Sequence, residues 1–221
     1  MYNNIDTKEC DILQITTVSI KNFVQDIFKK EPQNLLISEQ LLIESLSISG
    51  KDFNNNKQEI CFQDLKEFQN LKYLEVANTL LTSSAISILS KITYLENLFI
   101  RNCTFSSRLN NIDKLTNIKS IRIYNCKGFN PSYLSTLKNL KRICLSKIEI
   151  KDINIFSELT LNSLDVSSSS IENWIGIDKL NINTLIINKK QYIKNEKEIT
   201  KCKFKIIIIA TDGYYIEKWI N

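Results

Sequence analysis

The sequence contains no histidine, which excludes Ser-His-Asp triads, Cys-His dyads and every metal site that needs an imidazole ligand. Its 4 glycines are isolated from one another, so a glycine-rich phosphate loop cannot form. Its 6 cysteines include no C-x-x-C pair, which argues against a structural zinc site. From these absences we predict a chain that is not an enzyme and that uses no metal and no cofactor.

Long apolar runs are also missing. The longest, at residues 206–210, is far shorter than the ~20 residues of a membrane-spanning helix. The first residues, MYNNIDTKECDILQ, show no positive region followed by an apolar run, so we expect no secretory signal. The expected location is therefore the cytoplasm, with reduced thiols, and export by a signal-independent route stays open.

The balance of residue types is that of a folded chain, with 43% hydrophobic and 24% charged residues. Only 2 prolines and 4 glycines are available for tight turns, too few for a β-sandwich or barrel. The net charge of +5 comes from lysines that are mixed with 24 acidic residues along the whole chain. Because nucleic-acid binders usually gather their basic residues in a stripe, nucleic acid is not the expected partner.

What the sequence has in place of these features is an internal repeat. The pattern L-x-x-L-x-L begins at Ile43, Leu71, Leu95, Ile118, Leu140, Leu161 and Ile182. After a first gap of 28 residues, which contains the predicted loop KDFNNNKQE, the spacings are 24, 23, 22, 21 and 21 residues. Such a period predicts a solenoid of about seven repeats.

Each pattern predicts a short strand, in which alternate side chains point to opposite faces. In the second repeat Leu74 and Val76 then point inward, while Tyr73, Glu75 and Ala77 point outward. The chain returns along the other side and adds apolar residues, as at residues 86–89. One repeat cannot bury its apolar side alone, so the core is expected to run through the stack.

The segments LKRICLSKIEIKDINIFSEL and ISEQLLIESLSISGKDF resemble leucine-rich-repeat proteins, and the internalin-like bacterial branch in particular, over about residues 35–192. The resemblance implies an α/β solenoid with a curved parallel sheet on its concave face and short helical or extended convex segments. The family's usual turn asparagine is replaced by Thr79, Cys103, Cys126, Ile148, Ser169 and Lys190.

Three regions are expected along the chain. Residues 1–34 form a helical N-terminal cap, because apolar residues recur at helical spacing up to Pro32. Residues 35–195 form the solenoid. Residues 196–221 form a C-terminal cap, in which FKIIIIA is a buried strand, TDG a turn and YYIEKWI a short helix.

The outward strand positions carry the candidate site, because curved solenoids usually bind through the concave sheet. Three of the four arginines lie on consecutive outward strands, and none of the 25 lysines falls at the 21 outward positions. Arginine and aromatic enrichment without lysine is typical of protein interfaces. The predicted partner-binding residues are Tyr73, Asn97, Phe99, Arg101, Arg122, Tyr124, Arg142, Cys144 and Asp165.

Two other interpretations of these residues remain. Arginine and aromatic ladders also stabilise exposed sheets by ordinary cross-strand packing. Cys144 near two guanidinium groups could have a lowered pKa and react selectively, although an inert thiol is favoured.

The sequence thus predicts a monomeric, non-catalytic protein–protein interaction module, acting as a microbial effector or adaptor, whose partner presents an acidic or aromatic surface. The alternatives are recognition of a polyanion or nucleic acid through the same arginines, an immunity protein that neutralises a toxin, and an enzyme dependent on Cys144 or Cys202.

Overall fold

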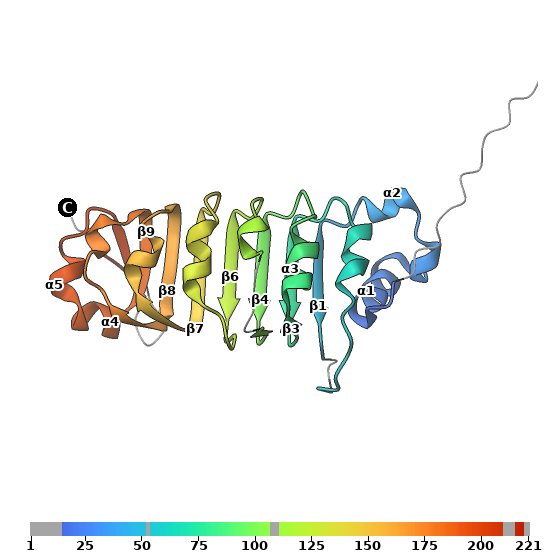
Figure 1. The fold of residues 1–221 in the computed structure, drawn as a ribbon, viewed down its shortest axis with the longest axis horizontal. Coiled ribbons are helices and arrows are strands. Elements are labelled where there is room, and N and C mark those ends of the chain that lie inside the picture. The colour runs from blue at the N-terminus through green and yellow to red at the C-terminus, as the bar shows by residue number, and fades with distance from the viewer. Residues whose placement is uncertain (1–14, 52–53, 107–110, 210–214, 219–221) are drawn as a thin grey trace, which may run out of the picture.

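The computed structural model describes residues 15–51, 54–106, 111–209 and 215–218. Its main element is one nine-stranded sheet in the order β1-β2-β4-β6-β7-β8-β9-β10-β11. Each neighbouring pair from β1 to β10 is parallel, and β11 is antiparallel to β10. Figure 1 shows the strands side by side along the long axis, with the helical return segments on one face of the sheet. We call the opposite face the concave face.

The strands of the main sheet are β1 (Ser45–Ser49), β2 (Tyr73–Ala77), β4 (Asn97–Arg101), β6 (Ser120–Tyr124), β7 (Arg142–Asp152), β8 (Thr160–Asn173), β9 (Asn181–Asn188), β10 (Lys205–Ile209) and β11 (Tyr215–Lys218). A second sheet pairs β3 (Leu80–Leu81) with β5 (Thr104–Phe105). The α-helices are α1 (Val18–Phe28), α2 (Ile37–Gln40), α3 (Ser83–Leu89), α4 (Lys189–Lys194) and α5 (Glu196–Ile199). The 3₁₀ helices are η1 (Pro32–Asn34), η2 (Phe62–Glu67), η3 (Ile112–Lys114), η4 (Pro131–Thr136), η5 (Ile153–Phe156) and η6 (Ile177–Lys179).

The repeat pattern and the strands coincide. Each of the seven L-x-x-L-x-L patterns leads into or lies within one parallel strand, from β1 to β9. The inward residues Leu74 and Val76 are fully buried. On the return helix α3, Ile86 is also fully buried and Leu89 is 1% exposed. One apolar core runs through all the repeats. The fold is therefore the predicted leucine-rich-repeat solenoid.

The turns after the strands are closed by side chains that donate to a backbone carbonyl of the preceding repeat. The Cys103 thiol donates to the carbonyl of Val76 over 3.5 Å, and the Ser169 hydroxyl donates to that of Leu145 over 2.9 Å. Cysteine and serine thus take the place of the family's asparagine, as the sequence predicted. In the last repeat the donor is Gln191 rather than Lys190, because the neutral amide of Gln191 satisfies two buried carbonyls at once.

Within the segment predicted as the N-terminal cap, the structure describes helix α1 where the apolar spacing predicted an amphipathic helix. Helix α1 buries Ile20 and Val24 and ends at Phe28, where Lys29 adopts a left-handed conformation with φ 55°. It is fastened to the first repeat by the buried Asp64 carboxylate, which accepts hydrogen bonds from the backbone amides of Thr16 (2.9 Å) and Thr17 (2.7 Å).

At the C-terminal end the prediction was only partly right. The strand predicted in FKIIIIA is β10, which continues the parallel ladder after β9. The short helix predicted in YYIEKWI is wrong, because Tyr215–Lys218 forms strand β11 against β10. This pairing satisfies backbone groups that β10 would otherwise leave open at the sheet edge. The predicted TDG turn at 211–213 lies outside the described residues.

Candidate partner-binding face

The nine predicted residues lie in three parallel rows across the concave face, as the strand register shows. The first row contains Tyr73, Asn97 and Arg142, the middle row contains Phe99, Arg122, Cys144 and Asp165, and the third contains Arg101 and Tyr124. Neighbouring strands in a sheet lie about 4.8 Å apart, so residues of one row are side by side. We call these nine residues the concave patch.

Two arginines of the patch are already held by side chains of the same face. The guanidinium of Arg101 forms an ion pair with the Glu75 carboxylate, which also accepts a 3.0 Å hydrogen bond from the Ser47 hydroxyl. The guanidinium carbon of Arg122 lies 5.3 Å from the centre of the Phe99 ring, a cation–π contact. These contacts fix the two guanidinium groups in place before any partner arrives.

The remaining patch residues are more open or more weakly held. Arg142 is exposed and forms no ion pair with the residues that the structure describes. Lys147, which lies within β7 directly after Ser146, places its ammonium group 5.1 Å from the centre of the Tyr124 ring. Burial, followed by the negative charge of Glu75, raises the pKa of Tyr73 above its ordinary value. This phenol is therefore neutral and can donate a hydrogen bond at neutral pH.

Cys144 has the chemistry of an inert thiol rather than of a nucleophile. Burial raises its pKa to about 11, the Asp165 carboxylate adds to the effect, and Arg122 opposes it. The thiol points its proton toward Asp165, with 3.7 Å between sulfur and oxygen. Burial likewise raises the pKa of Cys202 to about 12. Both thiols are protonated at neutral pH, which argues against the cysteine-dependent enzyme considered above.

Two features of this face differ from the outward positions expected from the pattern. Ala77 lies in the third row but is fully buried, which we attribute to Arg101, whose side chain extends from the neighbouring strand toward Glu75. Glu75 itself was not among the predicted site residues, although it forms the ion pair with Arg101. The repeat pattern could have identified Glu75, because it aligns this outward position directly beside Phe99 and diagonal to Arg101.

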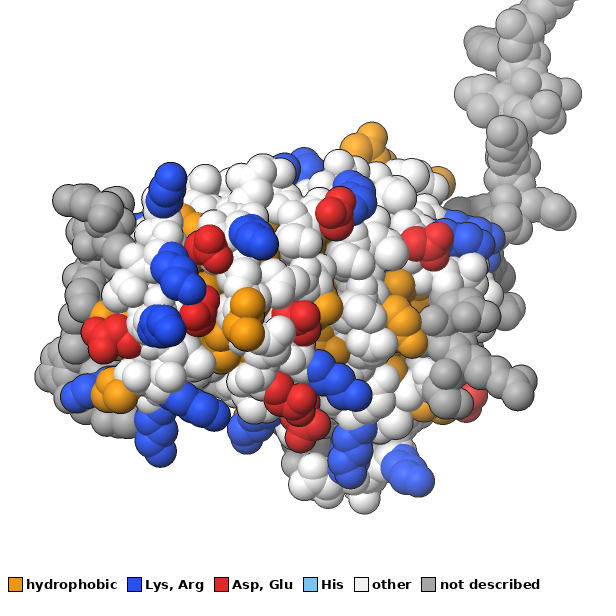
Figure 2. Space-filling model, turned by 60° about the vertical axis from the view of Figure 1, so that its left-hand side comes forward, with side chains coloured by type: hydrophobic (Ala, Val, Ile, Leu, Met, Phe, Trp, Pro, Cys, Tyr) orange, Lys and Arg blue, Asp and Glu red, His pale blue; other side chains and the backbone are white. Residues whose placement is uncertain are grey.

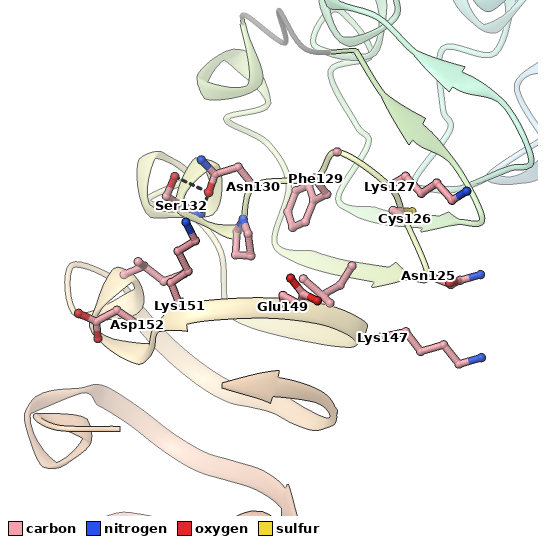
Figure 3. A pocket seen from close by; sticks show the side chains of 14 residues that line it. Asn125, Cys126, Lys127, Phe129, Asn130, Ser132, Lys147, Glu149, Lys151 and Asp152 are labelled. Carbon is pink, nitrogen blue, oxygen red and sulfur yellow. Dashed lines mark hydrogen bonds between the residues drawn. The ribbon is translucent and has the colours of Figure 1, made fainter. Parts of the chain in front are cut away.

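Two depressions border the patch. One, of about 650 Å³, lies between α1 and the first strands and is lined by Arg101 together with Asn22 and Asp26 of the helix. The other, of about 600 Å³, lies beyond the end of β6 and beside the second half of β7, where Phe129 and Ile155 contribute apolar surface and Lys151 contributes charge (Figure 3). Elsewhere on the surface, acidic and basic side chains are interspersed, as Figure 2 shows for one view.

In the described part of the chain, no cluster of three or more metal-ligating side chains is present. None of the helices in that part is both long enough and apolar enough to span a bilayer.

Comparison with known proteins gives structural similarity only. No protein-family model and no curated protein matches the sequence. Similar solved structures include a leucine-rich-repeat protein of Leptospira interrogans (TM-score 0.46, 17% identity, 80% of this chain and 50% of that chain). Others are the leucine-rich-repeat domain of the type III effector XopL of Xanthomonas (0.42, 16%, 70% and 63%) and InlP of Listeria monocytogenes (0.42, 12%, 77% and 63%). The chain thus spans half to 63% of the length of these proteins.

Proposed function

We propose that the protein is a non-catalytic interaction module that binds a partner protein through the concave patch. A role as a microbial effector or adaptor belongs to this proposal and rests on the sequence resemblance to internalin-like proteins. The partner surface that fits the patch carries carboxylates for Arg142 and Arg122 and an aromatic or apolar side chain for the area around Phe99.

The observation that carries this proposal is the diagonal line of arginines on three successive strands, two of which are already held by side chains of the same face. A flexible arginine loses side-chain entropy when it is fixed at an interface, about 0.5–1.5 kcal/mol for each immobilised side chain. Arg101 and Arg122 have lost part of that freedom already, through Glu75 and Phe99. Such pre-organised arginine and aromatic groups are the usual energetic centres of protein interfaces.

The charge pattern of the patch favours a protein over a polyanion as its ligand. Glu75 and Asp165 lie in the middle row, on either side of Phe99, Arg122 and Cys144. A chain of phosphates laid across the sheet would meet these two carboxylates at close range and be repelled. A protein surface, which alternates acidic, basic and apolar groups, can match them.

The proposal is tested by capturing partners from lysate, identifying them by mass spectrometry and measuring their affinity for purified variants. The test variant is Arg122→Ala/Arg142→Ala. The matched control is Lys114→Ala/Lys138→Ala, which removes the same charge from exposed sites on the return segments. Circular dichroism checks that both variants fold.

We expect the arginine variant to weaken the complex by at least about 2 kcal/mol, or roughly thirtyfold in Kd, and the control to change it little. Equal affinity of both variants would place binding elsewhere on the molecule. A log–log salt dependence as steep as that of phosphate binding would instead favour a polyanion.

A further inference from the structure

The two long edges of the solenoid differ in how their charges are paired. At the edge where the strands begin, two lysines each face a glutamate of the preceding repeat. The Lys72 ammonium lies 2.6 Å from a Glu44 carboxylate oxygen, and Lys119 lies 2.6 Å from Glu96. At the edge where the strands end, lysines lie beside other lysines.

Among the described residues, the lysines at this second edge have no acidic partners. Lys51 and Lys57 are direct partners in an antiparallel β-bridge, and both are exposed. Like charges directly opposite each other in a sheet are destabilising. Lys127 lines one groove together with these two lysines, and no aspartate or glutamate is among the described residues that line this groove. Within the described residues, no carboxylate lies within ion-pair distance of these three ammonium groups.

Between these lysines runs a row of side-chain amides, one in each of three successive repeats. Asn78, Asn102 and Asn125 each follow a strand directly and adopt left-handed backbone conformations, with φ of 54°, 52° and 50°. Asparagine tolerates this conformation better than most residues. The Asn125 amide donates to the Asn102 side-chain oxygen over 2.9 Å, and the Asn78 amide donates to the Ser49 hydroxyl over 3.0 Å. Each of these bonds uses one of two N–H groups and leaves the other for a ligand.

These six side chains line one groove of about 850 Å³, which we call the asparagine groove: Lys51, Lys57, Asn78, Asn102, Asn125 and Lys127. Figure 3 shows Asn125 and Lys127 from the neighbouring depression, where both side chains point away from the Phe129 ring. The asparagine groove shares Asn125 and Lys127 with that depression, but its lining includes none of the nine residues of the concave patch.

We propose that the asparagine groove binds an anionic polysaccharide. The ammonium groups of Lys51, Lys57 and Lys127 would pair with its sulfate or carboxylate groups, which relieves the repulsion between Lys51 and Lys57. The amide row would exchange hydrogen bonds with sugar hydroxyls, because both groups donate and accept. The repeat spacing of about 4.8 Å between successive amides suits an extended chain with regularly placed polar groups.

Two other ligand classes fit the groove less well. Single-stranded nucleic acid is usually held by aromatic side chains on which the bases stack, and no aromatic residue is among the described residues that line the groove. A hydrophobic peptide needs an apolar pocket, but the described lining is mainly amide, hydroxyl and ammonium groups.

The test measures the affinity of the purified protein for a heparin-derived octasaccharide and for a hyaluronan octasaccharide, which separates sulfate from carboxylate recognition. A single-stranded oligonucleotide of matched charge is the comparison ligand. The first variant is Lys51→Ala/Lys57→Ala/Lys127→Ala. Its matched control, Lys72→Ala/Lys119→Ala/Lys141→Ala, removes the same charge from the opposite edge.

A second variant distinguishes a loss of binding from a loss of folding. Asn102→Asp retains the oxygen that accepts from Asn125 and is tolerated in the left-handed conformation, but it replaces an amide donor by a negative charge. We expect it to weaken octasaccharide binding while leaving the melting temperature nearly unchanged.

We expect at least one octasaccharide to bind, the groove variant to lose about tenfold or more in affinity, and the opposite-edge control to stay within about twofold. Equal losses in the two lysine variants would show a response to net charge alone and overturn the proposal. So would absence of octasaccharide binding, or oligonucleotide binding as tight as that of the saccharides. Because Arg122→Ala/Arg142→Ala should bind the octasaccharide like the unmodified protein, failure of this proposal is distinct from failure of the concave-patch function.

Discussion

Removal of the Asp64 carboxylate should release the N-terminal cap from the solenoid. The side chain is 6% exposed and accepts hydrogen bonds from the backbone amides of Thr16 and Thr17 and, over 3.3 Å, from the Thr16 hydroxyl. Thr17 is 1% exposed, so in Asp64→Ala its amide would have no water to bind. Helix α1 would lose its main polar attachment to η2.

The expected cost follows from the environment of each bond. A hydrogen bond to a charged group contributes about 1.5–3 kcal/mol, and leaving a buried donor unsatisfied costs about 1–3 kcal/mol. Since the Thr16 amide is partly exposed and can bind water, we count mainly the Thr17 bond and expect a loss of about 2–4 kcal/mol. In a solenoid each repeat contacts only its neighbours, so the loss should appear as local opening of α1 rather than as global unfolding.

Hydrogen exchange measures this directly. Protection of the α1 amides should fall by about thirtyfold or more in Asp64→Ala, while amides of β7 and β8 keep their protection. Glu67→Ala, at an exposed position of the same 3₁₀ helix, is the matched control and should change neither region. Protection of α1 within about twofold of the original protein would refute the assignment of Asp64 as the attachment point.

Three further outcomes are expected. Burial, and then the Asp165 carboxylate, raise the pKa of the Cys144 thiol to about 11. Its alkylation by iodoacetamide should therefore be slow at pH 7 and accelerate toward pH 11. Rapid labelling at pH 7, followed by peptide mass spectrometry, would contradict this. Lys29, the exposed C-cap residue of α1, has φ 55°, a conformation that asparagine adopts more readily, so Lys29→Asn should stabilise the fold by about 0.5 kcal/mol in denaturant titrations, and a loss of stability would count against this reasoning. Ser169→Ala removes a buried hydroxyl that accepts from the Ile148 amide, and should cost about 1–3 kcal/mol, whereas no measurable change would show that water replaces it.

The solenoid could be predicted from the sequence because two independent periods agree. Alternation within each strand placed Leu74 and Val76 inside, and the spacing of 21–24 residues between patterns placed the strands side by side. Both are local or regular features, so no long-range contact had to be guessed. The register of the concave face followed from the same alternation, which is why the nine patch residues share one face.

What the sequence did not reveal depends on contacts between distant segments. Asp64 lies 47 residues from Thr17, and nothing in the local pattern marks it as a buried acceptor. Strand β11 was predicted as a short closing helix, because the open edge of β10 that it pairs with is visible only in three dimensions. The asparagines before Thr79, Cys103 and Cys126 carried a readable signal, since one recurs at the same place in three repeats.

Within one short segment of a repeat, neighbouring side chains point to three different parts of the molecule. In β4 and the residue after it, Leu98 packs in the core, Arg101 faces the concave side and Asn102 turns toward the edge. Because these side chains point in different directions, substitutions at Arg142 and Lys127 share no partner and their effects should add. In the double variant, the affinity for the partner protein should therefore fall by the same factor as in the Arg142 variant, and the affinity for the octasaccharide by the same factor as in the Lys127 variant. Larger or smaller losses would mean that the concave patch and the asparagine groove act as one continuous surface.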